Sequence, residues 1–286
     1  HEIRGDEGGI CHQILPENGY VLPGQLILGT DSHTTTHGAL GAFAMGIGAT
    51  EMASVWTLGS ILNLEVPATI KVIINGTLPQ HISSKDIILS LIGKISAKGA
   101  TFKVLEFHGS CIANMPVSNR LTISNMSVEA GATTGIIPAD QETMRYLKEE
   151  AGVTRTVETI LPDDDAVYEK IINIDVSKLQ PQVACPHTVD NVKPISEVQG
   201  IDLNQVVIGS CTNGRLDDLE MAAKVLKGKK VAKNVRMLIF PASGRIYQAA
   251  LEKGYLRDLT QAGAVIMNPG CGCCLGVHQG ALADGE

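Results

Sequence analysis

Short runs of aliphatic and β-branched residues alternate with helical patterns along most of this chain. Strands are predicted at residues 25–29, 69–74, 102–107, 206–208, 235–240 and 264–267. Helices are predicted at residues 49–62, 121–130, 142–149, 216–226 and 245–253, with a further helix that starts near Ser83 and is ended by Gly99. Strands that alternate with helices form parallel sheets joined by right-handed crossovers. The fold class is therefore predicted to be α/β, with mainly parallel sheets.

Residues 159–197 do not follow this alternation. Prolines stand at positions 162, 181, 186 and 194, and three aspartates stand together at 163–165. Three consecutive residues cannot all face one ion, so we interpret the aspartates as a solvated loop. The region is predicted to be a boundary or linker with one short strand near 171–174.

The composition excludes several classes of protein. Aromatic residues make up 3% of the chain and the net charge is −7, which argues against nucleic acid as the main partner. No apolar run approaches the ~20 residues that span a bilayer. Neither a Walker A motif nor a complete dinucleotide fingerprint is present. Because no signal peptide is visible, a cytoplasmic protein is expected.

The cysteines give the sharpest chemical signal. Cys271 and Cys274 form a C-x-x-C pair in a Gly/Pro loop after a predicted strand, and Cys211 follows another strand. Loops at the carboxyl ends of parallel strands lie at one edge of a sheet, so these three thiols can converge. The spacing leaves four possibilities open: an iron–sulfur cluster held by three thiolates, a zinc site with a fourth ligand such as Cys111, Cys185 or His278, a redox dithiol, or buried structural thiols.

A second signal is the polar segment that follows strand 25–29. Asp31, Ser32 and His33 are consecutive, so they do not form a hydrolase triad, because neighbouring side chains diverge. A polar group at the carboxyl end of a strand suits a small charged substrate. Taken singly, His12 is more often a structural histidine and Glu129 a solvated helix residue.

Four motifs together carry a resemblance to a known family. They are GTDSHT at 29–34, NMSVEAGATT at 125–134, GSCTNG at 209–214 and PGCGCCLG at 269–276. In this order they resemble the aconitase superfamily of hydro-lyases, and most of all the large subunits of 3-isopropylmalate dehydratases and homoaconitases. The resemblance implies aconitase-like α/β/α three-layer domains. We expect residues 1–67 to form the C-terminal part of a first domain, 68–190 a second domain, and 191–286 an incomplete third domain that carries the cysteines.

The resemblance also implies a cofactor. It places a [4Fe–4S] cluster on Cys211, Cys271 and Cys274, and it places Asn125 beside that cluster. The family usually has proline at the position of Cys273, which we do not expect to be a ligand.

In the same way, the resemblance implies the catalytic residues. His12 is expected to pair with Asp31, and His33 with Glu129. A carboxylate partner raises the pKa of an imidazole and orients its ring for proton transfer. Ser32 is expected to contact a substrate carboxylate.

The implied reaction is the dehydration and rehydration of a hydroxy dicarboxylate through an alkene. For the dehydratase type, this reaction interconverts 2-isopropylmalate and 3-isopropylmalate in leucine biosynthesis. An aconitase-type reaction on another hydroxy acid is the alternative, and an iron-sensing RNA-binding protein is a more remote one. In this family the catalytic base comes from a small domain or small subunit with no counterpart in this sequence. An Asp-His motif and an arginine motif are expected before His1 and after Glu286, as in an internal fragment of a large subunit.

Overall fold

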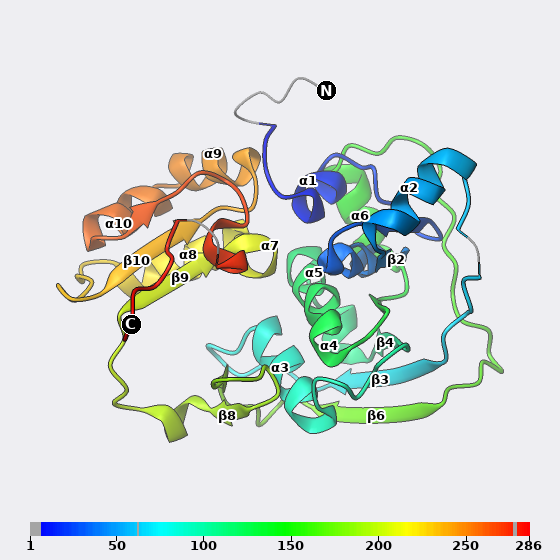
Figure 1. Cartoon of the computed structure of the whole chain (residues 1–286), viewed down its shortest axis with the longest axis horizontal. Helices are drawn as coiled ribbons and strands as arrows, with labels where there is room; N and C mark the ends of the chain where they lie inside the picture. Colours follow the sequence, from blue (N-terminus) through cyan, green and yellow to red (C-terminus); the bar gives the residue numbers. More distant parts are fainter. Residues whose placement is uncertain (1–6, 62, 277–278) are drawn as a thin grey trace. The chain divides into compact units, whose positions relative to one another are not determined.

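A computed structural model describes residues 7–61, 63–276 and 279–286 (Figure 1). The chain divides into two compact units. The central unit is Asn18–Gln199, and the split unit joins the residues up to Glu17 to Gly200–Glu286. The division into three domains at 67/68 and 190/191 stays a prediction.

The central unit is built on a four-stranded parallel sheet in the order β5-β4-β3-β6. Its strands are β3 (Thr69–Asn75), β4 (Val104–His108), β5 (Thr134–Ile136) and β6 (Lys170–Asp175). Along β3 the side chains of Ile70, Val72 and Ile74 are buried and the residues between them are more accessible. This alternation is the two-residue period of a strand that packs one face against a core.

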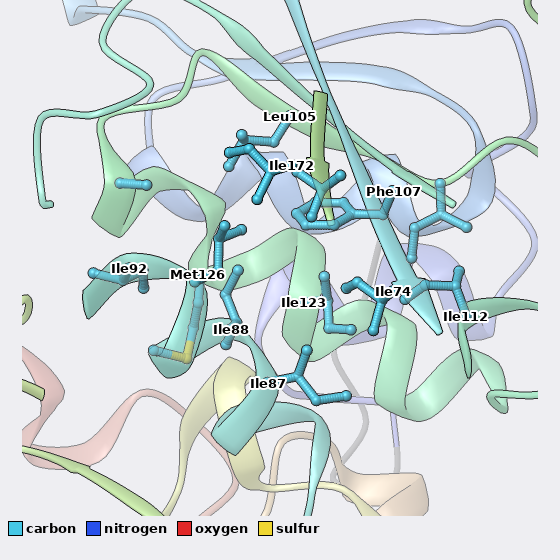
Figure 2. Packing of buried hydrophobic residues seen from close by; sticks show 14 of the residues in the cluster. Ile74, Ile87, Ile88, Ile92, Leu105, Phe107, Ile112, Ile123, Met126 and Ile172 are labelled. Carbon is cyan, nitrogen blue, oxygen red and sulfur yellow. The ribbon is translucent and has the colours of Figure 1, made fainter. Parts of the chain in front are cut away.

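Helices α3 (Ser84–Ile95) and α5 (Val117–Asn125) supply the other side of that core. The Ser83 and Asp86 side chains form a capping box that starts α3, as the sequence predicts. Figure 2 shows Ile87 and Ile88 of α3 near Ile123 of α5 and Phe107 of β4. These apolar contacts hold the sheet and the helices as one packed body.

The same unit contains a smaller parallel pair, β1 (Leu26–Gly29) and β2 (Phe43–Gly46). Between them runs a 3-10 helix, η1 (Ser32–Leu40), which the strand and helix patterns did not predict. The remaining elements are α2 (Ala49–Leu58), α4 (Ser110–Ala113), η2 (Met126–Ala130) and α6 (Gln141–Glu149). The helix predicted at 121–130 is in fact two elements, because α5 changes to the tighter η2 at Met126.

The short strand predicted near 171–174 is confirmed as β6, but the linker prediction for the rest of 159–197 missed a hairpin and a short 3-10 helix. Strand β6 pairs with β3 inside the main sheet. Strands β7 (Gln182–Ala184) and β8 (Val192–Pro194) form an antiparallel hairpin that packs on α3, followed by η3 (Ile195–Val198). The side chain of Val192 packs against Gly93 of α3, and a Cβ added at Gly93 would collide with it. Of the prolines in this region, Pro181 directly precedes β7 and Pro194 ends β8. Asp163, Asp164 and Asp165 are exposed, as predicted.

The split unit has a three-stranded parallel sheet in the order β11-β10-β9. Its elements are α1 (Cys11–Glu17), β9 (Gln205–Gly209), α7 (Ser210–Asn213), α8 (Leu216–Leu226), β10 (Arg236–Phe240), α9 (Gly244–Glu252), α10 (Tyr255–Ala262), β11 (Val265–Ile266) and η4 (Gly272–Leu275). The core lies between this sheet and α8, α9 and α10 (Figure 1). The predicted α/β class with mainly parallel sheets is confirmed. No helix among the described residues is long and apolar enough to cross a membrane.

Candidate functional site

His33 lies in the central unit, just after the carboxyl end of β1, between two carboxylates. Asp31 precedes η1 and acts as its N-cap, because its Oδ1 accepts a hydrogen bond from the backbone N of His33 at 2.8 Å. The same Oδ1 lies 3.7 Å from Nδ1 of the His33 ring. On the other side of the ring, Nε2 lies 3.5 Å from Oε1 of Glu129 on η2. The cap therefore orients the ring between Asp31 and Glu129.

This arrangement changes the proton affinity of the ring. The hydrogen bond to Glu129 raises the pKa of His33 above its usual value, and the negative charges of Asp31 and Glu129 act in the same direction. Partial burial of the ring opposes this rise without cancelling it. The imidazole of His33 therefore stays charged at higher pH than an unperturbed histidine.

The ring is partly open to small molecules. The side chain of His33 is 23% exposed, and those of Asp31 and Glu129 are 51% and 37% exposed. The hydroxyl of Ser32 is exposed and lies 3.4 Å from His33 Nδ1. A hydroxyl and an imidazolium side by side can both donate hydrogen bonds to one carboxylate.

Asn125 is fully buried where α5 ends. Its Nδ2 donates to Oγ1 of Thr36 at 2.8 Å, and its carbonyl accepts from Oγ1 of Thr35 at 3.2 Å. Both threonines belong to η1, the 3-10 helix that carries His33. Asn125 directly precedes η2, which carries Glu129, so its hydrogen bonds fix η1 against the start of η2. The contact of Asn125 with a cluster stays a prediction.

The predicted cysteine ligands lie in the split unit, in loops that follow β9 and β11. Cys211 is buried in α7, Cys271 is half-buried before η4, and Cys274 is exposed in η4. Both loops are tied to the residues after β10. Gly214 accepts a hydrogen bond from the backbone N of Ala242 at 2.9 Å, and Pro241 accepts one from the N of Gly270 at 3.1 Å.

Two glycines allow this close approach. Gly209, before Cys211, has a φ of 152°, and a Cβ added there would collide with the backbone and side chain of Phe240. Gly272, after Cys271, has a φ of 59°, and a Cβ there would collide with the Phe240 ring. Both cysteine loops therefore pack on the same buried phenylalanine at the end of β10.

The surroundings of Cys211 and Cys271 suit thiolate ligands. Cys211 and Cys271 contact the same apolar core, which gives the low-dielectric surroundings typical of such centres. Over the described residues, no three His, Cys, Asp or Glu side chains come together in a group that could hold a metal ion. The ligand set of Cys211, Cys271 and Cys274 stays a prediction, and His278 lies outside the described residues.

His12 lies in α1 of the split unit, with 3% exposure. Its ring nitrogens are 3.6 and 3.8 Å from the Sγ of Cys11. Asp31 belongs to the central unit, and the His12–Asp31 pair stays a prediction.

The motif analysis did not single out Arg215, which follows the GSCTNG segment. Arg215 is 3% exposed, and its guanidinium donates to the carbonyls of Cys211 at 2.6 Å and Thr212 at 2.9 Å. The only sequence signal was its position directly after a cysteine motif, because burial of an arginine depends on contacts distant in the sequence.

Comparison with known proteins identifies relatives of the whole chain. The profile of the Aconitase family (aconitate hydratase) matches residues 2–200 and 194–286. The 3-isopropylmalate dehydratase large subunit 2 of Archaeoglobus fulgidus is 52% identical over 278 residues, which cover 97% of this chain and 66% of that protein. The methanogen homoaconitase large subunit of Methanocaldococcus jannaschii is 49% identical over 290 residues, covering 99% of this chain and 68% of that protein.

A solved structure shares the fold. The holo-form of Thermococcus kodakaraensis aconitase X matches with a TM-score of 0.52 and 17% identity, over 92% of this chain and 61% of that chain. The chain spans about two thirds of the length of the curated relatives that it matches, 66% for several of them.

Proposed function

Because the chain belongs to the aconitase family, we propose that it is the catalytic, cluster-bearing part of a hydro-lyase large subunit. The proposed reaction interconverts 2-isopropylmalate and 3-isopropylmalate by dehydration and rehydration, a step of leucine biosynthesis. Identities of 47–52% to 3-isopropylmalate dehydratase large subunits support the substrate class. The observation that carries the reaction type is the His33 ring between Asp31 and Glu129.

His33 is the proposed proton donor. Removal of a hydroxyl group from a hydroxy acid requires a proton on the leaving oxygen, and a charged imidazole can supply it from a ring nitrogen. Glu129 and Asp31 favour the charged form and stabilise the ring orientation. On rehydration the neutral ring takes the proton back. The proposed role of Ser32, whose exposed hydroxyl lies beside the ring, is to hold a substrate carboxylate.

We propose that Cys211, Cys271 and Cys274 hold a [4Fe–4S] cluster. When bound, such a cluster supplies a Lewis acid that polarises the hydroxyl and carboxylate oxygens of the substrate. The packing of both cysteine loops on Phe240 supports this proposal, because it brings loops from different strands to one place. Asn125 is proposed to contact the cluster, and His12 to pair with Asp31 as a second proton-transfer pair.

The proposed partner is a small subunit that supplies the catalytic base and further substrate-binding groups. The names of the relatives, which are large subunits, support it. A cytoplasmic location is proposed as well, because reducing conditions suit a cluster held by thiolates.

Homoaconitase activity is the second candidate. Identity to methanogen homoaconitase large subunits is 49–50%, which does not separate the two substrates. RNA binding has less support, because the net charge is −7.

The test is to assemble the chain with its small subunit, reconstitute it anaerobically with iron and sulfide, and assay hydration of the alkenes from isopropylmalate and homocitrate. We expect turnover of the isopropylmalate series and broad absorbance near ~400 nm. Cys211→Ser should abolish both, whereas Cys273→Ser, a matched control in η4, should keep both. Turnover of homoaconitate alone would contradict the proposed isopropylmalate substrate. Equal loss of turnover and absorbance in Cys211→Ser and Cys273→Ser would contradict the ligand assignment.

A further inference from the structure

A buried arginine holds the Cys211 loop from within the split unit. Every nitrogen of the Arg215 guanidinium has a protein acceptor. Nη2 donates to the carbonyl of Cys211, Nη1 to the carbonyl of Thr212, and Nε to Oε1 of Gln13 at 3.1 Å. Two of these acceptors are backbone groups of the cysteine loop, and the third belongs to α1.

The hydrogen bonds continue beyond Gln13. Its Nε2 donates to Oε2 of Glu17 at 3.0 Å, and that same oxygen accepts from Oγ of Ser243 at 3.0 Å. Gln13, Glu17 and Ser243 are 6%, 7% and 0% exposed. Ser243 also caps α9, accepting from the backbone N of Ile246 at 3.2 Å. A single buried polar chain thus links the Cys211 loop, α1 and the start of α9.

A series of buried hydrogen bonds like this one fixes the geometry of its members more than it adds to the stability of the fold. A buried polar group that loses its partner costs about 1–3 kcal/mol, and more if it is charged, so each member penalises displacement of its neighbours. Arginine suits this role because its planar fork presents several donors in fixed directions, which lysine cannot match. The helix held by these hydrogen bonds is α1, which carries His12.

We propose that Arg215 is a positioning residue for the cysteine centre. Its guanidinium sets the path of the Cys211 backbone and, through Gln13 and Glu17, the position of the His12 helix relative to Cys211. The assignment of a cluster to Cys211 rests on the function proposed above. The hydrogen bonds from Arg215 to the loop do not depend on that function, so the cluster and the role of Arg215 can be tested separately.

The first test uses the full-length protein without a cluster and measures alkylation of Cys211 by iodoacetamide, followed by peptide mass analysis. Cys211 is 5% exposed, and Cys111 of the central unit, at 7%, is the internal reference. Arg215→Lys should speed alkylation of Cys211 about tenfold or more and leave Cys111 unchanged, because only the Cys211 loop loses its clamp.

Arg120→Lys is the matched control. Arg120 is also fully buried, and its fork binds both carboxylate oxygens of Asp140 and backbone carbonyls of the central unit. It should leave Cys211 alkylation at the wild-type rate. Equal acceleration by Arg215→Lys and Arg120→Lys, or no acceleration by Arg215→Lys, would overturn the proposal.

A milder variant covers the case in which Arg215→Lys fails to fold. Gln13→Leu removes the link to α1 and leaves the two bonds from Arg215 to the Cys211 and Thr212 carbonyls. It should speed Cys211 alkylation by a smaller factor, about threefold. An unchanged rate in this variant would contradict the link through Gln13.

The second test addresses the cluster itself. After anaerobic reconstitution, the absorbance near ~400 nm should decay in air several-fold faster in Arg215→Lys than in the wild type or Arg120→Lys. If the wild type assembles no cluster, the proposed function fails, and the alkylation result still decides the role of Arg215. If the cluster forms and decays equally in all three proteins, the positioning role toward the cluster is wrong.

Discussion

The two compact units hold their candidate residues in opposite ways. In the central unit, His33, Asp31 and Glu129 are partly exposed side chains, and the hydrogen bond from His33 to Glu129, together with the two negative charges, raises the pKa of the ring. In the split unit, the Cys211 loop is held through its backbone, by Arg215 on one side and the Phe240 segment on the other.

This difference follows from the chemistry proposed for each unit. A proton donor must meet the substrate and exchange protons with water, so its groups stay accessible and are tuned by neighbouring charges. Ligands of a cluster must keep one geometry and avoid water, so buried backbone contacts suit them better. The largest expected effects below therefore concern chemistry in the central unit and packing in the split unit.

His33→Asn should give the largest effect. Loss of the proton donor is expected to lower the turnover of the reconstituted two-subunit complex about 10²–10⁴-fold. The exposed His81, at a φ of 71° that asparagine tolerates, offers His81→Asn as a matched control with wild-type turnover. Similar losses of turnover in both variants would contradict the role of His33 as proton donor.

Gly272→Ala tests the packing of the cysteine loop. A Cβ at this positive φ would collide with the Phe240 ring, so the free energy of unfolding should fall by about 2–4 kcal/mol in urea denaturation. Gly276→Ala has the same backbone requirement, at a φ of 68°, but among the described residues nothing lies within 4 Å of the added Cβ, so it should cost only about 1–2 kcal/mol. Equal costs would show that Phe240 does not support the loop.

Asp218 gives the split unit a distinct pH dependence. Its carboxylate accepts hydrogen bonds from the backbone N of Arg215 and from Asn213, but desolvation raises its pKa to about 6, with a further contribution from Asp217. The native state therefore binds this proton more tightly than the unfolded state, whose ordinary value is 3.8.

Between these two pKa values, stability should fall as the pH rises, by up to about 3 kcal/mol, because each pKa unit corresponds to about 1.4 kcal/mol. Urea unfolding of the wild type and of Asp218→Asn across this range should differ by that slope. A wild-type stability that rises with pH relative to the variant would contradict the sign.

Glu129→Gln should change the free energy of unfolding least of these variants, because its expected effect is on the pKa of a single side chain. It removes the largest cause of the raised pKa of His33, so that pKa should fall toward its usual value. Asp31→Asn, which keeps the cap on η1, should lower it less, and a ring-proton NMR titration measures both. In the wild type, the stability from the raised pKa is present below about 6.5 and lost as the pH rises through the raised value. A larger drop for Asp31→Asn would reverse the roles of the two carboxylates.

Much of the fold was predictable because its signals are local. The strands β3, β4, β9 and β10 and helix α8 lie where their apolar periods place them, since burial of one face requires that period. The hairpin of β7 and β8 was missed because its strands have three residues each and lie among prolines, and η1 was missed because a polar Thr-rich run carries no helical period. Its threonines are buried only because Asn125 and Asp31 satisfy the η1 backbone and hydroxyls.

The sequence by itself determined the chemistry that this protein carries: three thiols and an Asp-Ser-His segment, each placed after a strand, in an order typical of one family. Tertiary structure decided which groups face one another. Glu129 reaches His33 because Asn125 joins η1 to the end of α5, and the guanidinium of Arg215 is buried where Gln13, Cys211 and Thr212 accept its hydrogen bonds. The contacts of Glu129 with His33, of Asn125 with Thr36 and of Arg215 with Gln13 join residues distant along the chain, and they form only when the packed core brings the segments together.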